Sequence, residues 1–219
     1  MKSIAIGFII LGTISVYVAI VNRNNKHSTV KQKILKAFYP VVMKLSHPKS
    51  LILVNNKNTV PVESFYSLSF NQIDGTPFNM ESLKGKKVLI VNTASDCGFT
   101  GQYEALEKLY QNHKEHLVII GFPANDFKAQ EQGDNKTIVA FCKKNYGVSF
   151  PLAEKGMVVK KNSQQLMYQW LTQKEKNGWC NQEPTWNFCK YLIDENGTLT
   201  HFFSSSVDPL GNEVTTALQ

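Results

Sequence analysis

The stretch KKVLIVNTASDCGFTGQYEALEKLY, residues 86–110, decides the fold, because it passes from an apolar run through a polar turn into a helical pattern. Residues 88–91 have the unbroken apolar character of a buried strand, and residues 100–113 have apolar side chains at helical spacing. A strand followed so closely by a helix is typical of α/β units. Cys97 lies in the turn between them, outside the apolar run where a cysteine that only fills space is expected.

The pattern continues in both directions along the chain. It predicts a strand over residues 66–70, a turn over 73–77, a second buried strand over 117–122, helices over 137–145 and 163–174, and a hairpin over 191–200 that turns at 195–197. A strand–helix–strand unit followed by a hairpin implies an α/β domain with a mixed central sheet and helices on both faces.

The N-terminus has a different composition. Residues 3–21 are apolar or small and carry no charge, and this is the length that a helix needs to cross a bilayer. The alternative, a cleaved signal peptide, usually has a small-x-small cleavage site, which the following VYVAIVNRNN does not offer. We therefore expect a transmembrane anchor over residues 1–22 and a single-pass membrane protein. The basic residues after the run favour a cytoplasmic body, but the side of the membrane stays open.

The charge is unevenly distributed. Residues 1–62 contain nine Lys or Arg and no acidic residue, whereas residues 63–219 contain 15 Lys and 17 Asp or Glu. We expect a basic juxtamembrane stem over 23–62, suited to an anionic lipid surface, and a near-neutral domain over 63–219. Within the stem, residues 30–45 predict an amphipathic helix on the membrane or on the domain, with Pro40 kinking or ending it. A near-neutral domain argues against nucleic-acid binding.

The position of Cys97 favours reactivity, because the start of a helix stabilises a thiolate through its unpaired N–H groups and its dipole. The run Cys97-Gly-Phe-Thr100 resembles the CxxC motif of thioredoxin, with threonine in place of the second cysteine. This pair alone therefore cannot exchange disulfides. A single thiolate that attacks an electrophile such as a peroxide O–O bond remains, and an inert turn cysteine is the alternative.

Three separated segments, VNTASDCGFTGQY (91–103), GFPANDFKAQEQG (121–133) and EPTWNFCKYLID (183–194), closely resemble the glutathione peroxidase family. The resemblance covers about residues 64–218. It implies a thioredoxin-like fold and the reduction of hydrogen peroxide and organic or lipid hydroperoxides. Matched segment by segment, it makes Cys97 the peroxidatic residue and Gln130, Trp186 and Asn187 its partners.

The chemistry of this set is consistent with that role. The Gln130 and Asn187 amides and the Trp186 indole N–H donate hydrogen bonds without adding a titratable charge. They would stabilise a thiolate and the charge that develops on the leaving oxygen. Taken singly, the tryptophan has an alternative role in core packing, and the two amides have alternative roles in turns or caps.

The reductant follows from further residues. Arginine suits the carboxylates of glutathione, and the only arginine is Arg23, which argues against glutathione without excluding it. Many thioredoxin-dependent relatives have FPCNQF where this chain has FPANDF, with Ala124 in place of cysteine. Cys142 stands where two-cysteine relatives carry their resolving residue, and a buried helix cysteine is the alternative. We expect Cys180 to be a surface thiol in a loop and Cys189 to pack in a strand.

The sequence therefore predicts a thiol peroxidase in which Cys97 reacts with hydroperoxide, Cys142 resolves it and a thioredoxin-like protein reduces the disulfide. A one-cysteine glutathione-dependent peroxidase and a redox relay or sensor remain open alternatives. No cysteine or histidine spacing indicates a metal site, and no cofactor is expected. The absence of a long insertion before TWNF resembles the monomeric members of the family.

Overall fold

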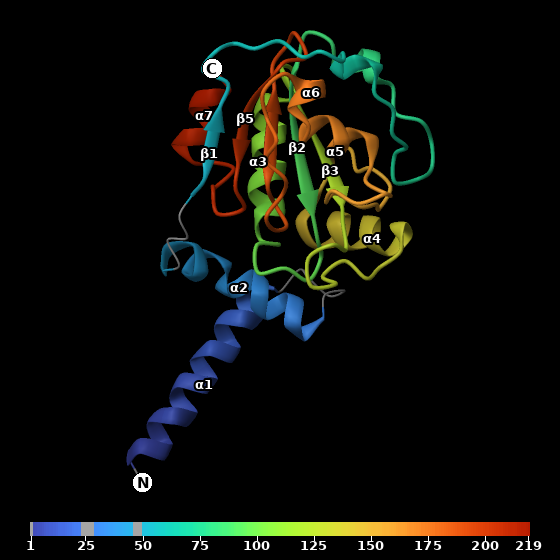
Figure 1. The fold of residues 1–219 in the computed structure, drawn as a ribbon. Coiled ribbons are helices and arrows are strands. Elements are labelled where there is room, and N and C mark those ends of the chain that lie inside the picture. Colours follow the sequence, from blue (N-terminus) through green and yellow to red (C-terminus); the bar gives the residue numbers. More distant parts are fainter. Residues whose placement is uncertain (1, 23–28, 46–49) are drawn as a thin grey trace.

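A five-stranded mixed sheet forms the centre of the computed structural model, which describes residues 2–22, 29–45 and 50–219 (Figure 1). The strand order is β1-β5-β4-β2-β3. Strands β2 and β3 are parallel, and the other neighbours are antiparallel. The strands are β1 (Ile52–Val54), β2 (Lys87–Thr93), β3 (Leu117–Pro123), β4 (Lys190–Ile193) and β5 (Leu199–Phe203).

Helices cover both faces of this sheet, as the sequence predicts. Buried side chains of α3, α4 and α7 pack on one face, and those of α5 and the short 3₁₀ helices η1 and η2 pack on the other. The helices are α3 (Gln102–His113), α4 (Asn135–Tyr146), α5 (Leu166–Leu171), α6 (Lys174–Asn177), α7 (Asn212–Ala217), η1 (Phe65–Ser67) and η2 (Met80–Leu83).

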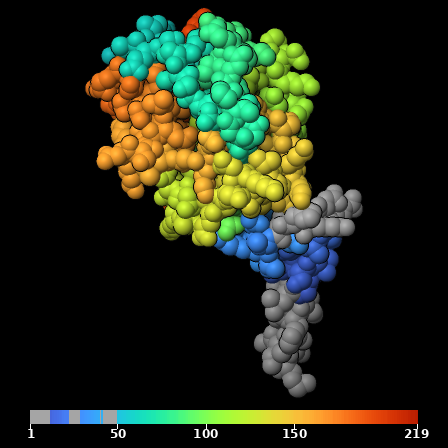
Figure 2. Space-filling view, turned by 90° about the vertical axis from the view of Figure 1, so that its right-hand side faces the viewer, coloured from blue at the N-terminus to red at the C-terminus, as the bar shows by residue number. Residues whose placement is uncertain are grey.

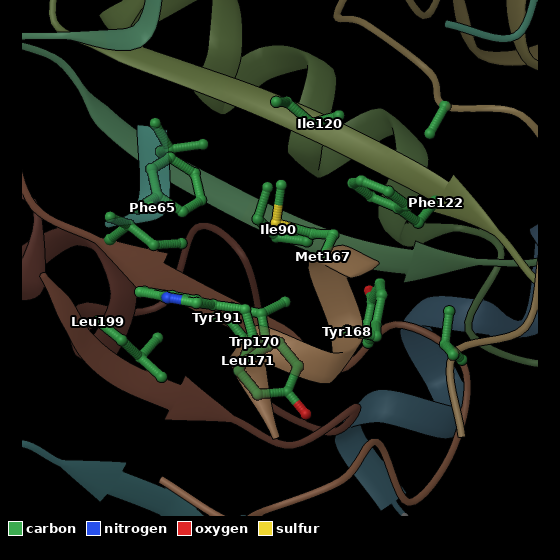
Figure 3. Close-up of a cluster of buried hydrophobic side chains, with 14 of the residues drawn as sticks. Phe65, Ile90, Ile120, Phe122, Met167, Tyr168, Trp170, Leu171, Tyr191 and Leu199 are labelled. Carbon is green, nitrogen blue, oxygen red and sulfur yellow. The ribbon is translucent and has the colours of Figure 1, made fainter. Parts of the chain in front are cut away.

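The core on the α5 face is rich in aromatic side chains (Figure 3). Trp170 of α5 is fully buried, and its ring lies 5.4 Å from that of Phe65. Tyr168 packs edge-on against Phe122 of β3 and Tyr191 of β4. Such rings bury large apolar areas, so this core stabilises the positions of β3 and β4 in the sheet.

Three elements differ from the sequence-based expectation. Residues 65–67 form the 3₁₀ helix η1 instead of a strand, with the Ser64 side chain accepting a hydrogen bond from the main chain of Tyr66. The helix expected over 163–174 is divided into α5 and α6. Strand β1 was not predicted, because it is only three residues long and depends on its pairing with β5.

Two helices precede the domain, α1 (Lys2–Val21) and α2 (Val30–Leu45). Across residues 2–22, 29–45 and 50–219, no helix combines the length and the apolar character that a bilayer span requires. The expected transmembrane helix over 1–22 and the single-pass membrane location are therefore wrong. Part of the apolar run packs within the chain instead: the Tyr17 hydroxyl donates to the Ala37 carbonyl (3.1 Å), and the buried Asn22 amide donates to the Lys33 carbonyl (3.0 Å).

The amphipathic helix predicted over residues 30–45 is present as α2, and it lies on the domain. The helix continues through Pro40 to Leu45, so Pro40 does not end it. It crosses the end of the domain where β2 and β3 finish (Figure 1), and in the space-filling view it lies directly against the yellow segments of the domain (Figure 2). Residues 23–28 and 46–49, which belong to the expected stem, lie outside the described residues.

Candidate active site

Cys97 lies in the turn that follows β2, and Thr100 holds this turn in shape. The main-chain N–H of Cys97 donates to the Thr100 hydroxyl oxygen at 3.0 Å. The same hydroxyl lies 3.0 Å from the Ala94 carbonyl and 2.7 Å from the Cys97 carbonyl. The threonine that replaces the second cysteine of a CxxC motif therefore fixes the loop that presents the sulfur.

The Cys97 thiol is completely buried, and burial raises its pKa. Hydrogen bonds act in the opposite direction, first from the Phe99 N–H, which lies 3.4 Å from the sulfur, and then from Asn187 and Trp186. Helix α3 begins only at Gln102, and the dipole effect is confined to the first turn of a helix. The expected thiolate stabilisation by the helix start is therefore outweighed by burial, and hydrogen-bond donors favour the anion instead.

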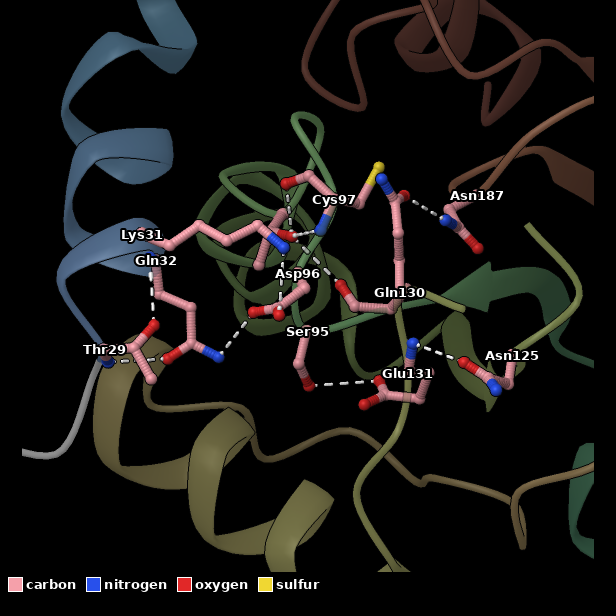
Figure 4. A network of polar contacts seen from close by, with 12 residues as sticks. Thr29, Lys31, Gln32, Ser95, Asp96, Cys97, Asn125, Gln130, Glu131 and Asn187 are labelled. Carbon is pink, nitrogen blue, oxygen red and sulfur yellow. Dashed lines mark hydrogen bonds and ion pairs between the residues drawn. The ribbon is translucent and has the colours of Figure 1, made fainter. Parts of the chain in front are cut away.

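Gln130 and Asn187 meet beside this sulfur (Figure 4). The Asn187 side-chain amide donates to the Gln130 Oε1 atom at 2.9 Å. The loop of Gln130 is tied to the loop of Cys97, because the Asp96 N–H donates to the Gln130 carbonyl at 3.0 Å. The structure thus brings together residues from three separate segments, as the sequence predicts.

Trp186 completes the set at the edge of the site. Its ring is partly buried and lies 5.8 Å from the Phe127 ring, and the Lys128 ammonium lies 5.5 Å from its centroid. The indole contributes a hydrogen bond that favours the Cys97 thiolate.

Backbone strain is concentrated around these residues. Lys128 and Ala129, which precede Gln130, have φ values of 52° and 50°, and Phe188, which follows Asn187, has a φ of 68°. Residues other than glycine rarely adopt this left-handed conformation, and it persists only where the surroundings enforce it. The two loops are therefore held in costly conformations that direct Gln130 and Asn187 toward Cys97.

Asn92, which sequence analysis did not identify, anchors the TWNF turn from β2. Its side-chain N–H₂ group donates to the Trp186 carbonyl at 2.9 Å, and its main-chain carbonyl accepts from the Phe188 N–H at 2.6 Å. The sequence signal was a polar residue at the end of a buried apolar strand. A buried polar group needs partners, and here its partners are the main chain of the site.

Glu131 is a second residue that sequence analysis missed. It is 1% exposed, accepts a hydrogen bond from the Ser95 hydroxyl (3.1 Å) and donates through its main chain to Asn125 (2.9 Å). Burial raises the pKa of its carboxyl group to about 7. It borders a cavity of about 290 Å³ that lies between α2, the Cys97 loop and α4.

Cys142, the expected resolving residue, lies on α4, and the structure does not join it to Cys97. Both are free thiols. Cys142 is 1% exposed, and burial raises its pKa to about 12, with Tyr103 acting in the opposite direction. Helix α4 is capped at its start by Asp134, which accepts from the Thr137 N–H at 2.8 Å, and at its end by Gly147 in the left-handed conformation. Cys142 is therefore a buried thiol on an intact helix that is capped at both ends.

The other two cysteines are also buried. Cys180, expected as a loop thiol, is 1% exposed and packs in the core on the α5 face. Cys189 precedes β4 and packs in the same core, as its pattern predicted. Within the described ranges, no group of three His, Cys, Asp or Glu residues is arranged to hold a metal ion.

The stem helix α2 contacts the loop of Cys97 and the helix of Cys142 at the same time. Lys31 and Gln32 both bind the Asp96 carboxylate, at 3.1 Å and 3.0 Å (Figure 4). The Lys36 ammonium donates to the Asn145 carbonyl at the end of α4 (3.1 Å). Glycine at position 101 permits this close docking, because a Cβ there would clash with the Tyr39 ring of α2.

Comparison with known proteins gives one consistent result. The model of the glutathione peroxidase family matches residues 65–172. A glutathione peroxidase-like peroxiredoxin of Chlamydomonas reinhardtii is 45% identical over 146 residues, which are 66% of this chain and 89% of that protein. A protein of the same description from Schizosaccharomyces pombe is 44% identical over 158 residues, 70% of this chain and 98% of that protein.

Solved structures agree in fold. The apo crystal structure of Trgpx has a TM-score of 0.55 and 32% identity, and the match covers 72% of this chain and 96% of that one. The crystal structure of T. cruzi GPX1 has a TM-score of 0.53 and 27% identity, with 71% and 93% covered. The predicted thioredoxin-like α/β fold with a mixed sheet is therefore confirmed.

Proposed function

Because this chain belongs to the glutathione peroxidase family, we propose that Cys97 is its peroxidatic residue and Cys142 its resolving residue. The protein is a thiol peroxidase that reduces hydroperoxides, and a thioredoxin-like protein is its reductant, in keeping with relatives named glutathione peroxidase-like peroxiredoxins. The catalytic domain spans residues 63–219, with β1 added to its sheet by the preceding segment.

In the first step, the Cys97 thiolate attacks one oxygen of the hydroperoxide. The O–O bond breaks, the leaving oxygen takes a proton and departs as alcohol or water, and Cys97 becomes a sulfenic acid. Asn187 occupies the Gln130 oxygen, so the Gln130 amide turns its N–H₂ group, a donor, away from Asn187. The Gln130 N–H₂ group and the Trp186 N–H would donate to the anionic sulfur and to the leaving oxygen as it becomes negatively charged.

In the second step, the Cys142 sulfur attacks the sulfenic acid sulfur. Cys142 loses its proton, a water molecule leaves and a Cys97–Cys142 disulfide forms. A dithiol of the thioredoxin type then reduces this disulfide to the two starting thiols. Because Cys142 is buried on a capped helix, the proposal includes a local opening of α4 before the second step.

The observation that supports this assignment most strongly is the contact between Asn187 and Gln130 beside Cys97. These residues come from three loops, two of them strained, and packing alone does not require two amides and a thiol to meet there.

The reductant is tested with the purified chain and hydrogen peroxide. A thioredoxin system and a glutathione system are supplied separately, and peroxide consumption is followed to many turnovers. We expect sustained consumption with thioredoxin only. Turnover with glutathione alone would favour the one-cysteine alternative, and oxidation that stops after one equivalent in both systems would favour a redox relay.

A further inference from the structure

Lys190, the first residue of β4, is a completely buried lysine that the proposed chemistry does not use. Its ammonium group donates to two main-chain carbonyls, those of Phe188 (2.9 Å) and Val207 (2.8 Å). Among the described residues, no carboxylate lies within ion-pair distance of it. A fully buried lysine is rare unless it is paired, so these two carbonyls are the feature that requires explanation.

The first carbonyl belongs to the strained residue that follows Asn187. Phe188 has a φ of 68°, its N–H donates to the Asn92 carbonyl (2.6 Å), and its ring packs edge-on against Tyr103 at 5.2 Å. Lys190 supplies the remaining restraint, on the carbonyl. The direction in which Asn187 projects depends on the conformation of this turn, and the carbonyl that Lys190 binds belongs to the residue directly after Asn187.

The second carbonyl, that of Val207, connects the same amino group to the segment that follows β5. Val207 lies in the turn after β5, and the neighbouring Ser205 carbonyl accepts from the Gln102 side chain at the start of α3 (2.6 Å). Lys190 therefore links the TWNF turn to the segment that also holds the first residue of the helix following Cys97. Lys190 is thus connected to the start of α3 indirectly, through the segment that contains Ser205 and Val207.

We propose that Lys190 is a positioning residue for the peroxidase: its buried amino group fixes the Phe188 turn and thereby directs the Asn187 amide toward the Cys97 sulfur and Gln130. This inference rests on the proposed roles of Cys97 and Asn187.

The protonation state of Lys190 does not decide this role. Burial lowers its pKa to about 7, while Cys189 and Asp208 act in the opposite direction. An ammonium group has three N–H donors and a neutral amine has two, so either form can hold both carbonyls. Lys190 therefore acts through its hydrogen bonds and not through its net charge.

Lys190→Met tests the proposal, because methionine keeps an unbranched apolar side chain and removes every donor. We expect the rate of Cys97 oxidation by hydrogen peroxide, followed by stopped-flow tryptophan fluorescence, to fall roughly tenfold, the factor that corresponds to about 1.4 kcal/mol. The apparent pKa of Cys97, measured from the pH dependence of alkylation, should rise, and it should rise likewise in Asn187→Ala, because Asn187 lowers this pKa. Lys87→Met is the control: Lys87 also donates to a main-chain carbonyl, that of Leu218 (3.0 Å), and its rate should stay within about twofold of the parent.

A double-mutant cycle separates positioning from general stability. If Lys190 acts through Asn187, Lys190→Met should cause no further loss in an Asn187→Ala background. Losses that multiply would overturn the proposal. If Lys190→Met does not fold, as judged by circular dichroism, Lys190→Gln enters the same cycle, because its shorter side chain keeps an N–H₂ donor at a changed distance. An Asn187→Ala variant as fast as the parent would overturn both this inference and the role of Asn187, whereas an active Cys97→Ser variant would overturn the proposed function itself.

Discussion

The Asn187 amide donates to the Gln130 side-chain oxygen across 2.9 Å, and this bond joins residues that stand 57 positions apart. The bond fixes the orientation of the Gln130 amide, since an amide whose oxygen is occupied directs its N–H₂ group elsewhere. Two strained loops carry the pair, so neither side chain depends on its own loop alone for its position.

Cys97→Ser should abolish peroxide reduction, because an alcohol lacks the nucleophilic sulfur. Cys97 lies in a packed cluster, so we also expect a stability loss on the order of 1 kcal/mol in urea unfolding. Cys180→Ser, at another buried thiol, is the control and should keep its activity. A Cys97→Ser protein that still consumes peroxide would remove the central claim.

Cys142→Ser should stop thioredoxin-dependent turnover but permit the first oxidation of Cys97, because only the resolving sulfur is lost. One equivalent of peroxide added to the parent chain should give an intramolecular Cys97–Cys142 disulfide in peptide mapping. A map in which Cys97 pairs with Cys180 or Cys189 contradicts this assignment, and so does full turnover by Cys142→Ser.

Asp134→Ala should speed disulfide formation after peroxide is added. Asp134 caps α4, and its pKa is lowered by the hydrogen bonds from Thr137, so its removal weakens the start of the helix that must open. The rate is followed by quenched alkylation of free thiols. Asp74→Ala is the matched control, because the Asp74 carboxylate also accepts from a main-chain N–H, that of Thr76, but caps no part of α4. An unchanged rate would show that opening of α4 does not limit the step.

Glu131→Gln should stabilise the protein at pH 8 and have little effect at pH 4.5. The pKa of Glu131 is raised by burial to about 7, so the folded state binds its proton more tightly than the unfolded state. This contribution to stability is fully present below the ordinary pKa of a glutamate and is lost as pH rises through about 7. The expected gain at pH 8 is on the order of 3 kcal/mol in urea unfolding. Glu213→Gln, on the surface of α7, is the control, and equal gains at both pH values would contradict the prediction.

Gln32→Ala combined with Lys36→Ala should accelerate the resolving step several-fold without changing the first oxidation of Cys97. Together these side chains connect α2 to Asp96 and to the Asn145 carbonyl of α4 through two part-buried hydrogen bonds, so both are removed at once. Lys33→Ala, on the same helix, is the control. If the double variant forms the disulfide at the parent rate, α2 does not restrain α4.

Sequence patterns predicted the elements that are stabilised locally or by burial. Strands β2 and β3, helices α3 and α4, and the β4–β5 hairpin have apolar periods that survive in the fold. Strand β1 was missed because its three residues are stabilised by distant β5, and the apolar N-terminal run was misread because part of it packs on α2. Propensity and periodicity describe a segment alone, and these elements depend on partners far along the chain.

The same reasoning applies to the site. Cys97, Gln130, Trp186 and Asn187 were predicted from three motifs, whereas Asn92, Glu131 and Lys190 were not. A lysine within KYLI reads as an interruption of an apolar strand, and only the structure identifies the two carbonyls that it binds. Buried residues that hold the loops of a site in place have no recognisable sequence motif, because their role depends on the main-chain atoms that they contact in the folded protein.

Helix α2 also makes the N-terminal segment sensitive to the oxidation state of the domain. On the proposed cycle, α4 moves toward Cys97 in every turnover, while the Asp96 end of the α2 contact stays with the Cys97 loop. The Lys36–Asn145 hydrogen bond would then break and reform with each cycle, so α2 would lose this contact with α4 in the disulfide form and keep its contacts with Asp96 and Gly101. Limited proteolysis of residues 29–45 would thus report peroxide exposure, and a binding partner that held α2 in place would slow peroxide removal without touching the active site.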